Sequence, residues 1–270
     1  MSIESNSQAA DNSSEPESGD HRPGRGVYLL PNLITTASLF SGFYAIVAAI
    51  DGNFFHAAMA IFVAMVCDGL DGRIARWTNT QSAFGKEYDS LADMVSFGLT
   101  PSIVAYQWGV ERIAEYGHLW GRFGWLASFF YAVCAALRLA RFNVREAKDK
   151  RFFEGLPSPS AAACVAGTIW VFSEYEVTGL PKLILSFVVT ATMGALMVSR
   201  FSYFSGKHLN LRGKVPWASL ALVPLGYMFF VAYGPAKTLL TAFGCYAASA
   251  PVLWIWRKTR RKRRAQTHVS

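Results

Sequence analysis

Charged residues are scarce in this sequence. Asp, Glu, Lys and Arg make up 16% of its 270 residues, against about 25% in an average soluble domain. Such a low charged fraction excludes an intrinsically disordered chain or a coiled coil over most of the length. Of all residues, 52% are hydrophobic, and they are arranged in long runs that hold almost no charge. This composition predicts an integral membrane protein.

Cysteine and histidine provide no framework for disulfides or for a soft metal site. Each cysteine stands alone inside an apolar run without C-x-x-C spacing, and no histidine is grouped with another. Isolated cysteines in apolar surroundings usually behave as small buried hydrophobes. We therefore expect all four to pack in the protein interior. They are Cys67, Cys134, Cys164 and Cys245.

The two ends of the chain are polar and differ in charge. Residues 1–26 begin with five acids and no Lys or Arg among the first 20, which predicts a disordered acidic tail rather than a signal peptide. Residues 257–270 hold seven Lys and Arg directly after an apolar run. At this position a basic run is typical of a cytoplasmic anchor that attracts anionic lipid headgroups. We expect no nucleic acid as a partner.

Residues 27–256 form the expected membrane domain, because their apolar runs recur at about the 20 residues that cross a bilayer as a helix. The pattern predicts an all-α, polytopic transmembrane helical bundle of about eight spans. Six spans are the alternative, since three runs are short or interrupted by polar residues. The eight expected spans are residues 29–50, 54–76, 87–109, 119–141, 157–173, 182–200, 215–233 and 236–256.

The charges in the loops predict the orientation of this bundle. With the N-terminus inside the cell, 22 of the 26 Lys and Arg residues lie on the cytoplasmic side, as the positive-inside rule requires. Both termini are then expected to be cytoplasmic, and the protein is expected in the inner (plasma) membrane. The basic pI of about 9.4 has the same cause.

Four aspartates interrupt the apolar pattern between residues 68 and 93. Asp68 and Asp71 are three residues apart, and Asp89 and Asp93 are four apart, so each pair shares one helix face. Two antiparallel helices would bring the pairs together, where their repulsion favours a bound divalent cation. Oxygen ligands without His or Cys favour Mg²⁺ or Mn²⁺, with Ca²⁺ also accommodated. Four carboxylates can hold two ions, as in metal-assisted phosphoryl transfer.

The residues around the aspartates favour a phosphate ligand. Gly72 and Gly85 lack a Cβ, so a bulky polyanion can approach the helix backbone closely there. Tight helix packing explains either glycine alone at least as well. Arg76 lies one turn beyond Gly72, where its guanidinium suits a phosphate oxygen.

Together these residues match the signature D-x2-D-G-x2-A-R-x8-G-x3-D-x3-D, in which the chain resembles the CDP-alcohol phosphotransferase family. Its eight fixed positions are Asp68, Asp71, Gly72, Ala75, Arg76, Gly85, Asp89 and Asp93. The resemblance implies a membrane enzyme that replaces CMP in a CDP-linked lipid or alcohol with a hydroxyl acceptor. It implies that the four aspartates hold two Mg²⁺ or Mn²⁺ ions, with Ca²⁺ as a non-productive substitute. It also implies that Asp93 acts as the general base.

The resemblance further implies which residues bind the two substrates. Near the signature, the residues expected to border CDP are Gly72, Ala75, Arg76, Gly85 and Lys86. Asn32 and Thr35, at the start of the first span, are expected to reach the nucleotide, although Asn32 serves equally well as a helix cap.

Three segments, residues 96–102, 136–143 and 153–160, resemble the branch of the family that uses L-serine. The residues expected to bind this acceptor are Ser96, Arg138, Arg141 and Asn143. Anchoring by the positive-inside rule explains either arginine alone equally well. The expected substrates are CDP-diacylglycerol and L-serine, and family analogy alone suggests a homodimer.

Three alternatives stay open. A non-catalytic lipid-binding or scaffold protein could keep the helices, but the intact set of four acids argues against it. A sister enzyme would use glycerol 3-phosphate or an inositol phosphate, and the same arginines would serve its acceptor. A metal-ion or solute transporter would also place carboxylates between helices. It needs no Gly, Ala and Arg framework around them, and the sequence contains no inverted repeat of the motif.

Overall fold

Helices dominate the computed structural model, which describes residues 29–78, 80–110, 118–144, 152–175, 179–204, 230 and 232–266. The helical class expected from the sequence is confirmed. The α-helices are α1 (Leu29–Ile50), α2 (Phe54–Trp77), α3 (Ala83–Asp93), α4 (Thr100–Ala105), α5 (His118–Val144), α6 (Ser158–Glu174), α7 (Leu180–Val198) and α9 (Pro235–Gln266). The π-helices are η2 (Met94–Leu99) and η3 (Tyr106–Val110), and the strands are β1 (Phe152–Glu154) and β2 (Ser202–Phe204).

Among the described residues, five helical segments are long and apolar enough to cross a membrane. They match five of the expected spans and are Leu30–Ile50, Phe54–Trp77, Gly124–Val144, Leu180–Val198 and Pro235–Trp256. The expected span 87–109 is divided among α3, η2, α4 and η3. The expected span 157–173 corresponds to α6, which has 17 residues. The count of eight spans and the orientation of the termini therefore stay predictions.

Two regions singled out in the sequence extend beyond the described residues. The acidic tail over 1–26 and nearly all of the expected span 215–233 lie outside them. The expected boundary at residue 256 is not a break in secondary structure, because α9 continues as a helix to Gln266.

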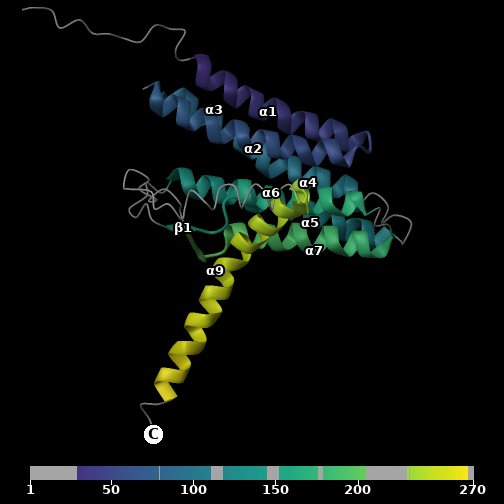
Figure 1. Cartoon of the computed structure of the whole chain (residues 1–270), viewed down its shortest axis with the longest axis vertical. Coiled ribbons are helices and arrows are strands. Elements are labelled where there is room, and N and C mark those ends of the chain that lie inside the picture. Colours follow the sequence, from purple (N-terminus) through teal and green to yellow (C-terminus); the bar gives the residue numbers. More distant parts are fainter. Residues whose placement is uncertain are drawn as a thin grey trace, which may run out of the picture.

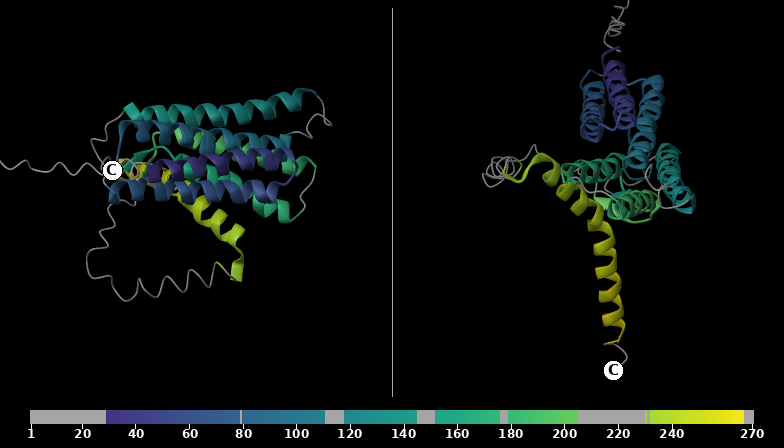
Figure 2. Two further views of the ribbon diagram at one scale, coloured as in Figure 1. Left: turned by 90° about the horizontal axis from the view of Figure 1, so that it is seen from above. Right: turned by 90° about the vertical axis from the view of Figure 1, so that its right-hand side faces the viewer.

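The helices form two groups that meet at α6. Figure 1 shows α1, α2 and α3 on one side and α5, α6 and α7 on the other, with α9 running away from the bundle; the second view in Figure 2 shows the same extension. α6 packs against α2, α7 and α9, and its residues 161–171 are all buried. Small residues in this stretch, including Ala162, Ala166 and Gly167, let neighbouring helices approach closely.

The third apolar region is not one regular α-helix, because π-helical segments interrupt it. η2 starts directly after Asp93, and π-helical turns often occur at functional sites. The usual α-helical donor to the Phe97 carbonyl would be the N–H of residue 101, but Pro101 has none. The Tyr131 hydroxyl donates to this carbonyl instead, at 3.2 Å. A side chain of α5 thus stabilises the irregular turn.

A short antiparallel ribbon departs from the expected all-helical fold. β1 and β2 pair with Phe153 opposite Tyr203, and the three-residue strands carry too few residues for a sequence pattern to reveal them. The Tyr203 hydroxyl donates to the Ala247 carbonyl at 2.9 Å, which ties the ribbon to α9. Burial raises the pKa of Tyr203 to about 12, so its hydroxyl remains a donor at neutral pH.

The cysteine prediction is confirmed in part. Cys134 and Cys164 are buried, Cys67 is half-buried, and all four thiols are free. Cys245 is exposed, so the expectation that it packs in the interior is wrong. It lies on α9, whose sides the described residues leave largely uncovered, and an apolar residue on a spanning helix can face lipid as well as protein.

Candidate active site

The signature aspartates converge in the structure. Asp68 and Asp71 on α2 and Asp89 on α3 each place one carboxylate oxygen within 4.8 Å of the others. Asp93 follows one turn after Asp89, and its carboxyl group is within hydrogen-bonding reach of Asp68. The helical spacing in the sequence therefore predicted the juxtaposition of all four acids correctly.

The scaffold beneath these acids is α1, which packs against both α2 and α3. Ser38 on α1 donates a hydrogen bond to the Ala64 carbonyl of α2 at 3.0 Å. The Thr36 and Tyr88 hydroxyls are 2.9 Å apart and join α1 to α3. Because both acidic helices are fixed to a common neighbour, their carboxylates face each other across a defined gap.

The chemistry of the cluster fits a hard divalent cation. Asp71 is only 5% exposed, and Asp68 and Asp89 are half-buried, so mutual repulsion is weakly screened by water. The neighbouring cations Arg73 and Arg76 are exposed. The clustered ligands are all carboxylate oxygens, a donor set that suits Mg²⁺, Mn²⁺ or Ca²⁺ and disfavours zinc or copper.

Thr35 contacts the acidic cluster directly. Its hydroxyl donates to Asp71 Oδ2 at 2.7 Å and also lies 3.1 Å from the Pro31 carbonyl of the preceding turn. The side chain is 4% exposed. The sequence indicated Thr35 as a nucleotide contact, whereas its observed hydrogen bond fixes one oxygen of a candidate metal ligand.

Gly85 sits in a tight environment at the start of α3. Its N–H donates to the side chain of Ser82, which caps the helix, at 2.9 Å. A Cβ at Gly85 would lie 3.1 Å from that Ser82 oxygen and 3.4 Å from Asn32 Oδ1. Packing therefore explains Gly85, and the same contact places Asn32 of α1 beside the signature.

Gly72 lies in open space. A Cβ added there would meet no heavy atom within 4 Å, so helix packing does not explain this glycine. Arg76 folds back along the same exposed edge of α2, and its Nε donates to the Gly72 carbonyl at 2.8 Å. Ala75 is half-buried and Lys86 is exposed. This edge of α2, next to Asp71, is open to a ligand.

Two of the predicted acceptor residues reach the acidic helices from α5. Asn143 donates to Ser90 at 3.0 Å, and Ser90 directly follows Asp89. Arg138 attracts Asp93 electrostatically. The Nη1 of Arg138 donates to Ser158 at 2.8 Å, while its buried Nε has no hydrogen-bond partner within the described part of the chain.

The other two predicted acceptor residues make contacts with neighbouring helices. Arg141 Nη1 donates to the Val198 carbonyl at the end of α7, at 3.4 Å. Ser96 is fully buried, and its hydroxyl donates to the Ser38 carbonyl of α1 at 3.2 Å. The structure gives both residues a packing role, and their part in acceptor binding stays a prediction.

Sequence reasoning missed Ser90 and Ser158 as partners of this site. Both residues lie within segments that were singled out, the signature and residues 153–160. Serine is too common for its position alone to signal a role, and both contacts depend on how helices pack. The only available signal was proximity to the recognised motifs.

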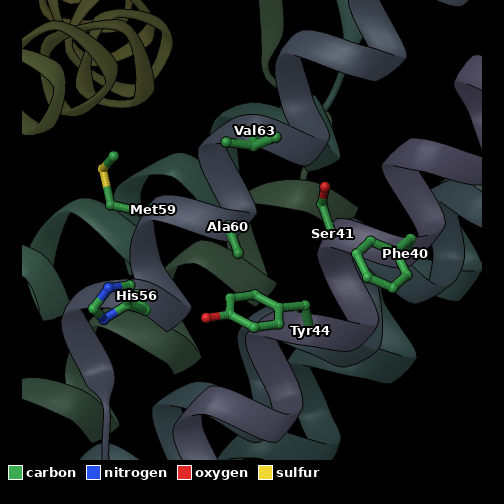
Figure 3. A pocket seen from close by; sticks show the side chains of 7 residues that line it. All are labelled: Phe40, Ser41, Tyr44, His56, Met59, Ala60 and Val63. Carbon is green, nitrogen blue, oxygen red and sulfur yellow. The ribbon is translucent and has the colours of Figure 1, made fainter.

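A separate apolar groove lies between α1 and α2, away from the acids. The groove has a volume of about 200 Å³. Figure 3 shows the residues that line it, which are Phe40, Ser41, Tyr44, His56, Met59, Ala60 and Val63. The His56 ring hydrogen-bonds to Asn53 at 2.8 Å. None of the residues that line this groove is a carboxylate.

Comparison with known proteins agrees with the site. The sequence profile named CDP-alcohol phosphatidyltransferase matches residues 28–247. A Helicobacter pylori protein named CDP-diacylglycerol–serine O-phosphatidyltransferase is 36% identical over 238 residues, which cover 87% of this chain and 94% of the relative. A Bacillus subtilis protein of the same name is 32% identical over 174 residues, covering 64% and 89%. One from Saccharomyces cerevisiae is 38% identical over 153 residues, covering 51% and 52%. The chain, whose converging aspartates lie on α2 and α3, therefore belongs to the CDP-alcohol phosphatidyltransferase family.

Proposed function

We propose that this protein transfers the phosphatidyl group of CDP-diacylglycerol to the hydroxyl of L-serine, releasing CMP and phosphatidylserine. The observation that carries the proposal is the cluster of Asp68, Asp71 and Asp89, which Asp93 adjoins, in a chain of this family. Relatives that bear the name of this activity support serine as the acceptor.

The metal would be held by the aspartates. Asp68, Asp71 and Asp89 supply clustered carboxylate oxygens, and Asp93 provides a fourth carboxylate for a two-ion set. We propose Mg²⁺ or Mn²⁺, with the larger Ca²⁺ as a non-productive substitute because it tolerates looser coordination. The chemistry that such ions supply is stabilisation of negative charge on the phosphate oxygens.

The residues around the metal ligands would bind the nucleotide. The open edge at Gly72 admits the pyrophosphate close to the helix backbone, and Arg76 beside it suits a phosphate oxygen. Asn32, adjacent to Gly85, is available to the CDP group from α1. The exposed apolar side chains of Leu70 and Leu91 flank the acids, so the acyl chains of the donor can remain in lipid.

Asp93 would act as the general base. Its carboxylate accepts the proton of the serine hydroxyl, the serine oxygen bonds to the phosphorus that carries diacylglycerol, and the bond from that phosphorus to CMP breaks. Arg138 attracts Asp93 and has a buried Nε–H to which no described residue offers an acceptor. A buried donor of this kind suits the carboxylate of an amino-acid acceptor.

We place the active site on the cytoplasmic side of the inner membrane, because the basic segments favour that orientation. The C-terminal end of α9 would contact anionic lipid headgroups. Trp254 and Trp256 mark the change from apolar to basic sequence, and Lys258 Nζ lies 4.8 Å from the centre of the Trp254 ring. Aromatic side chains of this kind are typical of the membrane interface. A homodimer stays a proposal from family analogy.

The decisive assay uses the purified full-length protein in mixed micelles with CDP-diacylglycerol, Mn²⁺ or Mg²⁺ and labelled serine. CMP release that requires both serine and the metal supports the proposal. Release with glycerol 3-phosphate or an inositol phosphate but not with serine moves the protein to a sister activity. Metal uptake into vesicles without CMP release would instead support a transporter.

The variant Asp93→Asn tests the general base. It keeps the size of the side chain but removes the proton acceptor, so we expect turnover to fall at least a hundredfold. Thermal melting and gel filtration in detergent check that the variant is folded. Asp51→Asn, an exposed residue far along the chain from the cluster, is the matched control. Retained activity in the Asp93 variant would rule out this base.

A further inference from the structure

We infer that Ser158 is a positioning residue that holds the Arg138 guanidinium in the orientation that receives the acceptor. The inference rests on the proposed function, because it assigns a partner to a residue of that acceptor site. The Oγ of Ser158 accepts a hydrogen bond from Arg138 Nη1 at 2.8 Å. Ser158 is the first residue of α6 and is 3% exposed.

The contact at Nη1 decides which edge of Arg138 remains for a ligand. A guanidinium is planar, so a hydrogen bond at Nη1, on one edge, fixes the direction of the opposite edge that carries Nε. That Nε–H is buried and has no partner among the described residues. Buried donors are normally satisfied, and a carboxylate suits this edge of the fork.

The oriented guanidinium lies where it and Asp93 can act on the same acceptor molecule. Arg138 attracts the Asp93 carboxylate, the proposed base for the acceptor hydroxyl. A molecule that carries a carboxylate and a hydroxyl two carbons apart can bind Arg138 with one group and approach Asp93 with the other. That description fits a 2-amino-3-hydroxy acid and excludes an amino alcohol that lacks the carboxylate.

Ser158 is held in place independently of Arg138. Gly155, three residues earlier, has φ +81°, and a Cβ there would clash with the Met197 carbonyl oxygen. The N–H of Gly155 donates to Phe201 at 2.9 Å, and that of Leu156 donates to Leu196 at 3.0 Å. These bonds fasten the start of α6 to the end of α7. The backbone that carries Ser158 is therefore anchored independently of the arginine.

The purely structural explanation is that Ser158 only satisfies a buried arginine. Steady-state kinetics separate the two explanations, because loss of a structural contact lowers the amount of active enzyme and affects both substrates alike. Loss of the orienting contact weakens the binding of the acceptor alone. A hydrogen bond to a charged group is worth roughly a tenfold change in binding or more.

The experiment compares Ser158→Ala with the wild type in the full-length, metal-loaded protein. We expect the KM for serine to rise about tenfold, with kcat and the KM for CDP-diacylglycerol within about twofold of wild type. Ser158→Thr retains the hydroxyl and is expected to restore the serine KM. The matched control is Ser160→Ala, a half-buried serine of the same helix, which is expected to change neither constant.

A double-mutant cycle tests whether Ser158 acts through Arg138. Arg138→Lys keeps the charge but has no Nε–H or fork, so adding Ser158→Ala to it is expected to leave the serine KM unchanged. Additive effects of the two changes would overturn the inference. So would a Ser158→Ala variant that loses kcat at an unchanged serine KM. Thermal melting identifies a variant that fails to fold. If Ser158→Ala does not fold, the serine KM of Ser158→Thr is measured in its place.

The two proposals fail in distinguishable ways. If the wild type releases no CMP with serine, the proposed acceptor is wrong, whatever Ser158 does. If the wild type uses serine and the KM of Ser158→Ala is unchanged, only the role of Ser158 is refuted.

Discussion

Thr35→Val removes the hydroxyl that contacts Asp71 while keeping the shape of the side chain. In the structure this hydroxyl donates to Asp71 Oδ2 at 2.7 Å inside a region that is almost fully buried. The bond fixes the rotamer of a candidate metal ligand and stabilises its charged form. Without it, the carboxylate must be reoriented each time a cation binds.

The magnitude follows from the type of contact. A hydrogen bond to a charged group contributes roughly 1.5–3 kcal/mol, and about 1.4 kcal/mol corresponds to a tenfold change in a binding constant. Loss of a partner behind a metal ligand typically weakens metal binding by about 10–100-fold. We therefore expect the Mn²⁺ concentration for half-maximal CMP release to rise at least tenfold in Thr35→Val, with activity recovered at high Mn²⁺.

Two variants serve as controls for Thr35. Thr35→Ser keeps the donor and is expected to show a metal requirement near that of the wild type. Thr36→Val removes the neighbouring hydroxyl, which lies 2.9 Å from the Tyr88 hydroxyl rather than beside a carboxylate. A Mn²⁺ requirement that is unchanged in Thr35→Val, or raised equally in both valine variants, would refute the reasoning.

The other predictions concern the open edge of α2, the turn before α6 and the ribbon. Gly72→Ala is expected to raise the KM for CDP-diacylglycerol about tenfold, because a methyl group would block close approach of the pyrophosphate. Gly69→Ala also places a methyl group where it meets no protein atom, and it should leave the KM for CDP-diacylglycerol unchanged. An equal rise in KM for both variants would argue against binding of the nucleotide at Gly72. Gly155→Ala should lower the melting temperature far more than Gly52→Ala. Both glycines have positive φ, but only at Gly155 would a Cβ lie against the backbone. This steric overlap adds about 1–3 kcal/mol to the destabilisation of the folded protein. For Tyr203, the folded-state pKa of about 12 exceeds the ordinary value of 10, so the unfolded chain loses its proton first and stability falls between about pH 10 and 12. Melting curves across that range should decline less steeply in Tyr203→Phe; an identical decline would contradict the assignment.

The positions of the acidic pairs were predictable from their spacing in the sequence. The spacing of Asp68 with Asp71 and of Asp89 with Asp93 places each pair on one face of a helix, whatever the rest of the chain does. Their convergence was therefore predictable once the two segments were expected to be antiparallel neighbours. The expected helix over 87–109 was less accurate, because the π-helical turns after Asp93 depend on contacts with α1 and α5 rather than on a periodic pattern.

The orienting contacts were not predictable in the same way. Thr35 and Asp71 are 36 residues apart, and Arg138 and Ser158 are 20 apart. Each pair meets only because particular helices pack together. From the residue type alone, Thr35 was interpreted as a nucleotide contact, and Ser158 gave no signal.

Sequence alone predicted a helical chain with apolar runs long enough to cross a membrane and with acids that cluster. Those properties follow from hydrophobic run length and from spacing within single helices, which are local. Tertiary structure decided which side chain orients each acid and each arginine, and which glycine is required by packing rather than open to a ligand. Those properties depend on distances between helices, which no spacing within one helix encodes.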